Sequence, residues 1–528
     1  MILKFLFKLS ILLNFIFFNC TSAFTFNEKL TVNLLPNSNA YFFFEFKSIW
    51  PKSASNNFEN YDLFPKRLGD IVSKFKVDEL SLTLSQGKWK YNEWGLPQKS
   101  APSGSELWTV FDENLSQLKI DSNWLQSSRA ISGLFGLSIN LQENPNTVVP
   151  KYSVVLNKNQ SENIRYASIP NEIFCTENLT PWIKLLPCGK NKGIAQLLKN
   201  SPKLFESHYF MASLFFKRKC NDQACSSVQF ELVQTLSLVY NADLITRQLD
   251  DEESTWSFNN IFQNKITNVC PVADVTNVLL NLKGKGKVTV MPTEKRDEMY
   301  VYNLKELLAS SKDFNPSIVQ KKNIQVSEKV PVSLHRYITD KNEINFGIKT
   351  LIKNENDQEV SIVYLDTIPW YFRVYISSLV VKDEDTSLNI KPDLINFVPG
   401  WDRKKPHHLE VKLTLKPKSV YSVYIRADFG YLKWDEFPPD VNHGFYINPV
   451  LLTIKSNQKE DIQIYSETLI MNLPTPDFSM PYNVICLTCT VIAIGFGSLH
   501  NFTTRKFKFI QQKNLKEKLF EFLKKFKK

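Results

Sequence analysis

The sequence predicts a mainly β protein: two β-sandwich-like lumenal domains with a few short helices, followed by one C-terminal transmembrane helix. Apolar and polar residues alternate in several short runs, among them residues 228–232, 287–291 and 411–415. This period of two is typical of a strand with one buried face. Many short strands separated by turn residues favour sandwiches over a parallel sheet. A longer apolar run near the C-terminus has the length of a membrane span.

The N-terminus predicts a secretory signal peptide at residues 1–23. It combines Lys4 and Lys8 with an apolar stretch at Leu9–Phe18 and a small residue, Ala23, at the expected cleavage site. The chain is therefore expected to enter the secretory pathway.

The C-terminal apolar run, Val484–Phe502, contains no Asp, Glu, Lys or Arg. As a helix it would be about 28 Å long, close to the thickness of a bilayer core. Arg505 follows, and the positive-inside rule places the basic end in the cytosol. We therefore predict a transmembrane helix at 482–502, a basic cytosolic tail at 503–528, and a type I protein of the endoplasmic reticulum membrane with its bulk in the lumen.

The formal net charge of +11 is concentrated at the two ends of the chain. Residues 505–528 carry ten Lys/Arg against two Glu, and the signal peptide adds Lys4 and Lys8. Residues 24–504 are within one charge of neutral, which excludes a basic footprint for nucleic acid.

Composition suggests where the lumenal part divides. A Gly- and Lys-rich stretch around Gly284 separates a β-rich domain at 24–283 from a β-sandwich domain at 284–475. Helical patterns are few, and they occur at Leu63–Phe75, Asn123–Leu134 and Gly193–Leu198.

The cytosolic tail has a helical pattern of its own. From Lys513 to Lys528, apolar residues recur at helical spacing among lysines. The pattern fits a basic amphipathic helix on the cytosolic leaflet, and a disordered retention tail is the alternative.

Five cysteines remain in the lumen, which is an odd number for an oxidising compartment. They are Cys175, Cys188, Cys220, Cys225 and Cys270. An odd count predicts a bond to another chain or a free thiol, and the count alone does not identify the cysteine concerned. The pair Cys220 and Cys225 would close a tight hairpin, leaving Cys188 and Cys270 as a second pair. Two further cysteines form a CxxC, Cys486 and Cys489, inside the span, where packing or acylation is favoured over metal binding.

Three sequons predict lumenal N-glycosylation, at Asn114, Asn159 and Asn178. No catalytic motif accompanies them: Gln223-Ala224-Cys225 is followed by two serines rather than by the rest of the caspase signature Q-A-C-[RQG]-G, and G-x-S-x-G does not occur. We read His407–His408, beside three basic residues, as a solvated loop. The tryptophans are read as core or interface residues rather than glycan-stacking ones: Trp89, Trp94, Trp108, Trp370, Trp401 and Trp434. No cofactor, metal site or catalytic residue is predicted.

Long strings of the sequence resemble the PIG-T family of GPI transamidase subunits. They include LFPKRLGDIVSKFKVDELSLTLSQGKWKYNEWGLP (Leu63–Pro97), APSGSELW (Ala101–Trp108), CTENLTPWIKLLPC (Cys175–Cys188), VQTLSLVY (Val233–Tyr240), LDTIPWYFRVY (Leu365–Tyr375), NHGFYINP (Asn442–Pro449) and LPTPDFSMPYNVICLTCT (Leu473–Thr490). The resemblance runs from about residue 60 to 505, and Leu282–Asp313 and the Lys-rich tail depart from it.

The resemblance implies a non-catalytic scaffold that holds a caspase-like catalytic subunit through a disulfide at Cys175. Cys175 would then be the odd cysteine, and the other four would pair within the chain. Multi-pass subunits are further implied partners, and the GPI lipid and the substrate proprotein are candidate ligands. A single-pass adhesion or receptor ectodomain is the alternative, which shares the topology but not these strings; a glycan-processing enzyme ranks third.

Overall fold

The computed structural model describes the chain apart from residues 1–23, 54–62, 139–145, 154–160, 171, 221–226, 248–252, 283–285, 297–298, 323–329, 439, 456–460, 476, 478, 507–513 and 526–528. The predicted signal peptide thus lies outside the described residues. Strands dominate, and one C-terminal helix is long and apolar enough to cross a membrane. The mainly β class with a C-terminal candidate transmembrane helix is confirmed. The chain forms two units, Met1–Tyr431 with Asn442–Leu473, and Leu432–Val441 with Pro474–Lys528.

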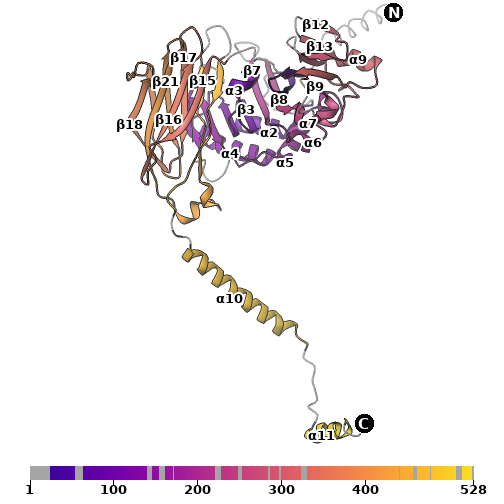
Figure 1. Ribbon diagram of the computed structural model, residues 1–528, viewed down its shortest axis with the longest axis vertical. Helices are drawn as coiled ribbons and strands as arrows, with labels where there is room; N and C mark the ends of the chain where they lie inside the picture. Colours follow the sequence, from indigo (N-terminus) through magenta and orange to yellow (C-terminus); the bar gives the residue numbers. More distant parts are fainter. Residues whose placement is uncertain are drawn as a thin grey trace, which may run out of the picture. The chain divides into compact units, whose positions relative to one another are not determined.

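The N-terminal part of the larger unit is built on one sheet of eleven strands (Figure 1). Their order is β12-β13-β10-β1-β2-β8-β7-β3-β4-β6-β5. Neighbours are antiparallel except β1 and β10, which are parallel. The strands are β1 (Thr25–Leu34), β2 (Asn39–Ser53), β3 (Val77–Gln86), β4 (Gly104–Phe111), β5 (Thr147–Val148), β6 (Ile164–Ile169), β7 (Tyr209–Cys220), β8 (Ser227–Asn241), β10 (Val275–Asn281), β12 (Glu294–Arg296) and β13 (Met299–Asn303).

Strand β2 shows how the two faces of this sheet differ. Phe42, Phe44 and Phe46 belong to a core shared with helices, whereas Tyr41 and Phe43 join a separate cluster on the opposite face. The helices that contribute to the shared core are α2 (Lys66–Phe75), α4 (Gln117–Phe135), α5 (Thr176–Lys184), η2 (Ile194–Leu198), α6 (Ser201–Leu204), α7 (Ala242–Thr246), α8 (Phe258–Phe262) and α9 (Leu304–Ser310).

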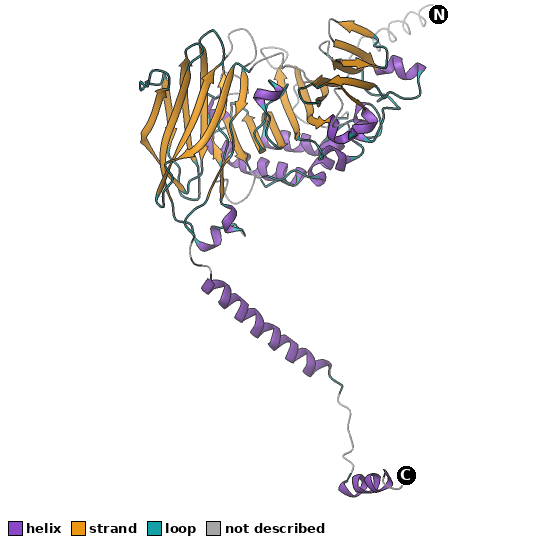
Figure 2. Ribbon diagram, in the orientation of Figure 1, coloured by secondary structure: helices purple, strands orange, loops and turns teal. Residues whose placement is uncertain are grey.

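Figure 2 shows helices gathered along one side of the sheet, so a helical layer, rather than the second sheet of a sandwich, covers this face. The three helices predicted from sequence appear as α2, α4 and η2. Further helices of the same unit are η1 (Ser161–Asn163) and α3 (Tyr91–Trp94).

A small sheet follows, in the order β11-β14-β9. It comprises β9 (Glu253–Ser257), β11 (Gly286–Val288) and β14 (Ser317–Lys321). Strands β12 and β13, although they come after residue 284, pair within the first sheet. Strand pairing therefore changes between β14 and β15 rather than near Gly284, which lies outside the described residues. The division into domains at 283/284 stays a prediction.

The next strands form two sheets linked by polar contacts. One has the order β15-β16-β21-β18 and the other β19-β20-β17-β23-β24. The Thr350 and Tyr364 hydroxyls lie 3.1 Å apart between β16 and β17. The strands are β15 (Val332–Thr339), β16 (Asn345–Asn354), β17 (Val360–Ile368), β18 (Phe372–Asp383), β19 (Leu394–Val398), β20 (His407–Leu415), β21 (Val420–Phe429), β23 (Leu451–Ile454) and β24 (Ile462–Tyr465). A separate pair consists of β22 (Phe445–Ile447) and β25 (Leu469–Met471).

Two prolines mark places where the chain leaves one sheet for the other. Pro369 lies between β17 and β18, and Pro417 lies between β20 and β21; in each case the flanking strands belong to different sheets. Proline has no N–H to continue a ladder, so it suits these crossings. Successive strands therefore alternate between the two sheets, as is typical of a β-sandwich.

Buried polar groups tie the first sheet to the sandwich. The Tyr465 hydroxyl donates to the Glu106 carboxylate at 3.0 Å. On β20, Glu410 accepts the backbone N–H groups of Lys151, Tyr152 and Ser153. Because each of these groups would be costly to bury alone, the contacts hold the two sheet systems in one unit.

The second unit contains α10 (Ser479–Thr504), α11 (Leu515–Lys525) and η3 (Trp434–Glu436), with η4 (Val441–His443) at its boundary. Helix α10 contains the predicted span at 482–502. Helix α11 corresponds to the helical pattern predicted in the tail.

Candidate interaction site at helix α5

Helix α5 is fixed to the first sheet by its apolar face. Leu179, Trp182 and Ile183 are buried in the core beneath it. The Trp182 indole N–H donates to the carbonyl of Ser213 on β7 at 2.9 Å, and the Gln234 amide on β8 donates to the Trp182 carbonyl at 2.8 Å. Buried aromatic area together with satisfied hydrogen bonds makes this a rigid base.

Cys175 begins this helix and is an exposed free cysteine. Its N–H donates to Asn178 Oδ1 at 2.9 Å, and its Sγ lies 3.2 Å from the same oxygen. Asn178 in turn donates from Nδ2 to the carbonyls of Phe135 and Gly136, at the C-terminal end of α4. The thiol is therefore held at the surface by a side chain that is itself bonded to a second helix.

The residues before Cys175 separate an anchor from an exposed surface. Phe174 is buried, with its ring 5.0 Å from that of Phe210 and 6.0 Å from that of Phe205. Ile173 is 79% exposed. An exposed aliphatic residue two positions from an accessible thiol provides apolar surface at the place where a partner would meet it.

The other end of α5 leads to a closed disulfide. Cys188 is bonded to Cys270, with their Cα atoms 5.9 Å apart and a sequence separation of 82. Cys270 is fully buried. Cys220 is also disulfide-bonded, while Cys225 lies outside the described residues, so the predicted Cys220–Cys225 pair stays a prediction. The free cysteines of the described chain are Cys175 and the two on α10, Cys486 and Cys489.

The three sequons differ in accessibility. Asn114 is exposed, and both its N–H and its Nδ2 donate to Asp112 Oδ1 at 2.9 Å. Asn159 lies outside the described residues. Asn178 is 4% exposed; its Oδ1 accepts the N–H of Cys175, and its Nδ2 donates to the carbonyls of Phe135 and Gly136. Glycosylation at the three sequons stays a prediction, and the contacts of Asn178 make it part of the capping box of α5.

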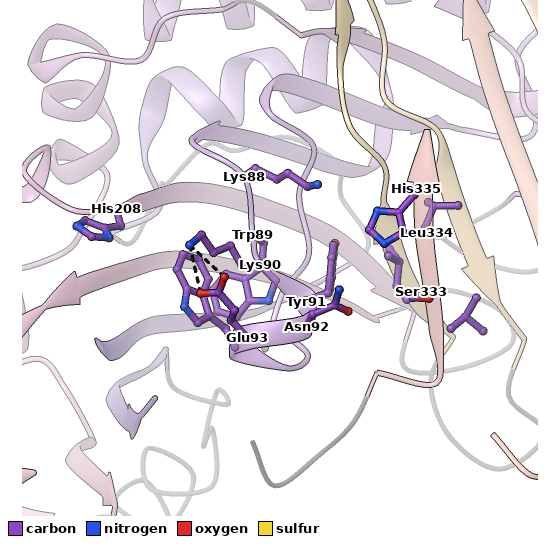
Figure 3. A pocket seen from close by; sticks show the side chains of 13 residues that line it. Lys88, Trp89, Lys90, Tyr91, Asn92, Glu93, His208, Ser333, Leu334 and His335 are labelled. Atoms are coloured by element: carbon purple, nitrogen blue, oxygen red, sulfur yellow. Dashed lines mark hydrogen bonds and ion pairs between the residues drawn. The ribbon is translucent and has the colours of Figure 1, made fainter. Parts of the chain in front are cut away.

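A cavity of about 550 Å³ lies between the segment 88–94 and strand β15. Figure 3 shows Lys88–Glu93 and Ser333–His335 on two sides of it. Lys88 pairs with Glu467 at 2.6 Å, and Lys90 pairs with Glu93 at 3.2 Å. Both lysines of the cavity are thus neutralised by neighbouring carboxylates.

The histidine pair predicted as a solvated loop lies on strand β20 instead. His408 is buried, 3.8 Å from Glu410, and His407 accepts the N–H of Gly400 at Nδ1. Burial lowers the pKa of both imidazoles. Pairing of β20 with β17 and β19 reduces their contact with water. The neighbouring basic residues had suggested an exposed loop in the sequence.

The tryptophans predicted as core or interface residues differ in their exposure, and an interface role for the exposed ones stays a prediction. Trp89, Trp94 and Trp108 are buried, whereas Trp401 and Trp434 are exposed. The Lys404 ammonium lies 4.1 Å from the Trp401 ring centroid, and the Arg403 guanidinium lies 5.1 Å from that of Trp370, which is half-buried. Both cations come from the loop between β19 and β20, and each lies over one of these two rings. Within the described part of the chain, no three His, Cys, Asp or Glu side chains are grouped so as to hold a metal ion.

Fold and site together define a class: a mainly β protein with one candidate membrane anchor and a thiol displayed on a rigid helix. The chain matches the protein family described as "Gpi16 subunit, GPI transamidase component" over residues 10–252 and 247–528. This chain belongs to that family of GPI transamidase components.

Relatives from animals and fungi are similar to this chain in sequence over most of their length. The chain is 34% identical to the mouse "GPI-anchor transamidase component PIGT", covering 91% of this chain and 89% of the mouse protein. It is 34% identical to the human protein of the same description, covering 91% and 90%. It is 27% identical to the "GPI transamidase component GPI16" of Saccharomyces cerevisiae, covering 95% and 93%. These matches support the transamidase-subunit interpretation and not the adhesion or receptor alternative.

Proposed function

We propose that this chain is the non-catalytic scaffold subunit of a GPI transamidase in the endoplasmic reticulum membrane. Residues 24–475 face the lumen, α10 spans the membrane, and the basic tail is cytosolic. A caspase-like subunit carries out the chemistry and is joined to this chain by a disulfide through Cys175. Family membership supports the assignment to the complex, and the charge asymmetry around the span supports the orientation.

The observation that carries this proposal is the state of Cys175. It is exposed and free, whereas Cys188, Cys220 and Cys270 are already disulfide-bonded. In an oxidising compartment an accessible thiol without an internal partner favours a bond to another chain. Such a bond makes further contacts between the two subunits intramolecular, with an effective concentration of the order of mM.

The rigidity of the site supports an orienting role. Cys175 is held through Asn178 to α4, and α5 is held through Trp182 to the sheet. A partner bonded to this sulfur is therefore attached to a fixed point on the scaffold rather than to a swinging loop. This is what positioning a protease relative to a membrane-bound substrate requires.

Helix α10 is the proposed contact with multi-pass subunits. The Thr488 and Thr490 hydroxyls donate to carbonyls one turn back, so they are satisfied within the helix. Gly495 and Gly497 leave open space at their Cβ positions, which permits close approach of another helix. Replacing Val484–Phe502 by an unrelated transmembrane helix is expected to impair assembly; full assembly and activity would contradict this contact.

Non-reducing electrophoresis of the tagged full-length chain, purified from its own membranes, tests the disulfide. We expect a heavier band that reductant converts to the monomer and that Cys175→Ser removes. Cys486→Ser is the matched control, because it replaces another exposed free cysteine and should leave the band unchanged. A covalent dimer that persists in Cys175→Ser contradicts the assignment.

A further inference from the structure

Helix α11 presents an apolar stripe that the proposed function leaves unexplained. Leu515, Leu519, Phe522 and Leu523 fall within a 100° arc of the helix at 100° per residue. All four are exposed, between 59% and 82%.

Lysines border this stripe on both sides. Lys516 lies at one edge, and Lys518 and Lys525 lie at the other, while Glu517 and Glu521 occupy the opposite face. Long lysine stems at the edges of an apolar face can extend their ammonium groups toward lipid phosphates while the stripe is buried. With four lysines against two glutamates, the described helix is cationic, so its complementary surface is anionic.

The position of α11 in the chain keeps it close to a bilayer. Helix α10 ends at Thr504 and α11 begins at Leu515. The ten intervening residues span at most about 35 Å even when fully extended. Eleven helical residues are about 16 Å long, too short for a second span.

We propose that α11 lies in the surface of the bilayer spanned by α10 and binds anionic lipid, with its leucine and phenylalanine stripe in the acyl boundary and its lysines among the headgroups. The helix then acts as a second, reversible contact with the membrane. The inference rests on α10 spanning a bilayer and does not depend on Cys175.

The test uses the full-length chain in liposomes, with Cys175→Ser, Cys486→Ala and Cys489→Ala to remove background labelling. An environment-sensitive fluorophore is attached at Phe522→Cys on the stripe or, as the matched control, at Glu517→Cys on the opposite face. In phosphatidylcholine vesicles containing 30% phosphatidylserine, the label at 522 should shift to the blue and be quenched by lipid-borne quenchers, and the label at 517 should not.

Two variants separate the contributions of charge and pattern. Each lysine changed to glutamine, for example Lys518→Gln, should lower the bound-to-free ratio about fivefold, because a lysine near an anionic surface contributes about 1 kcal/mol. Exchanging Lys518 and Leu519 keeps composition and charge but puts a lysine inside the stripe, and it should abolish the shift at 522.

Three results would overturn the proposal. Equal signals at 522 and 517 would show that the helix does not lie on its stripe. A fluorescence shift at 522 that is the same with and without phosphatidylserine would contradict the binding of anionic lipid. A label at 522 that is exposed in liposomes but buried in the purified complex would assign the stripe to a protein partner.

Discussion

The two ends of α5 carry cysteines in opposite chemical states. At the N-terminal end, Cys175 is exposed and free. At the C-terminal end, the chain reaches Cys188, which is bonded to the buried Cys270 just before strand β10. The chain just after the helix is thus joined covalently to the segment that leads into β10, and the start of the helix presents an exposed thiol.

This difference shows how one helix can serve both stability and assembly. The Cys188–Cys270 bond closes a long loop, which constrains the unfolded chain and so stabilises the fold. The Cys175 thiol contributes no such closure within its own chain. A bond formed there with another subunit would attach that subunit, through α5, to the sheet rather than to a flexible segment.

We expect the largest effect from removing the Cys188–Cys270 disulfide, beyond the C-terminal end of α5. Replacing both Cys188 and Cys270 by alanine should lower the free energy of unfolding by about 2–5 kcal/mol, since the bond closes a loop of 82 residues. Denaturant unfolding of the full-length chain in detergent measures it. Cys175→Ser is the control and should leave the stability of the isolated chain unchanged; equal losses would break the comparison.

We also expect the stability of the region around the Cys188–Cys270 disulfide to depend on pH. Glu28 on β1 is buried; it accepts the N–H of Ile194, a few residues after Cys188, and the hydroxyl of Thr276, a few residues after Cys270, and burial raises its pKa to about 7. A raised carboxyl pKa stabilises the fold at low pH: the contribution is full below about 4.5 and is lost as pH rises through about 7.

We therefore expect Glu28→Gln to flatten the pH dependence between pH 5 and 8 by up to about 3 kcal/mol, and to stabilise the chain most at pH 8. Thermal unfolding at both pH values measures this difference. Glu45→Gln, on the neighbouring strand and beside Lys29, is the matched control and should change little. An unchanged profile in Glu28→Gln would show that Glu28 does not retain its proton in the folded state.

The smallest effect is expected at the free end. Asn178→Ala removes the cap of α5 and the link to α4, and should cost about 1–2 kcal/mol and slow formation of the Cys175 bond. Thr180→Ala destroys the same sequon but leaves the Asn178 contacts intact, so it should be nearly neutral. If Asn178 carried a glycan, both variants would lose the same endoglycosidase-sensitive mass.

The sequence predicted those parts of the fold that depend on neighbouring residues better than those that depend on contacts between distant residues. The stripe of Leu68, Ile71, Val72 and Phe75 predicted α2 because helical periodicity is a local property. By contrast, β1 lies between β2 and β10, and the β10 partner is far away in sequence, so no local pattern reports it.

The site shows the same limit. The odd cysteine count pointed to an unpaired thiol, and the family strings pointed to Cys175. The sequon hid the structural role of Asn178, because its acceptors, Phe135 and Gly136, are about forty residues away. The asparagine three positions after Cys175, in the place of a capping-box residue, was the one signal available in the sequence.

Disulfide mapping of the purified, unreduced complex tests the central claim most directly. Proteolysis followed by mass spectrometry should give a peptide containing Cys175 linked to a cysteine of a different polypeptide, and a peptide containing Cys188 linked to Cys270. A Cys175 peptide that is bonded within its own chain, or that remains a free thiol throughout the assembled complex, would contradict the account.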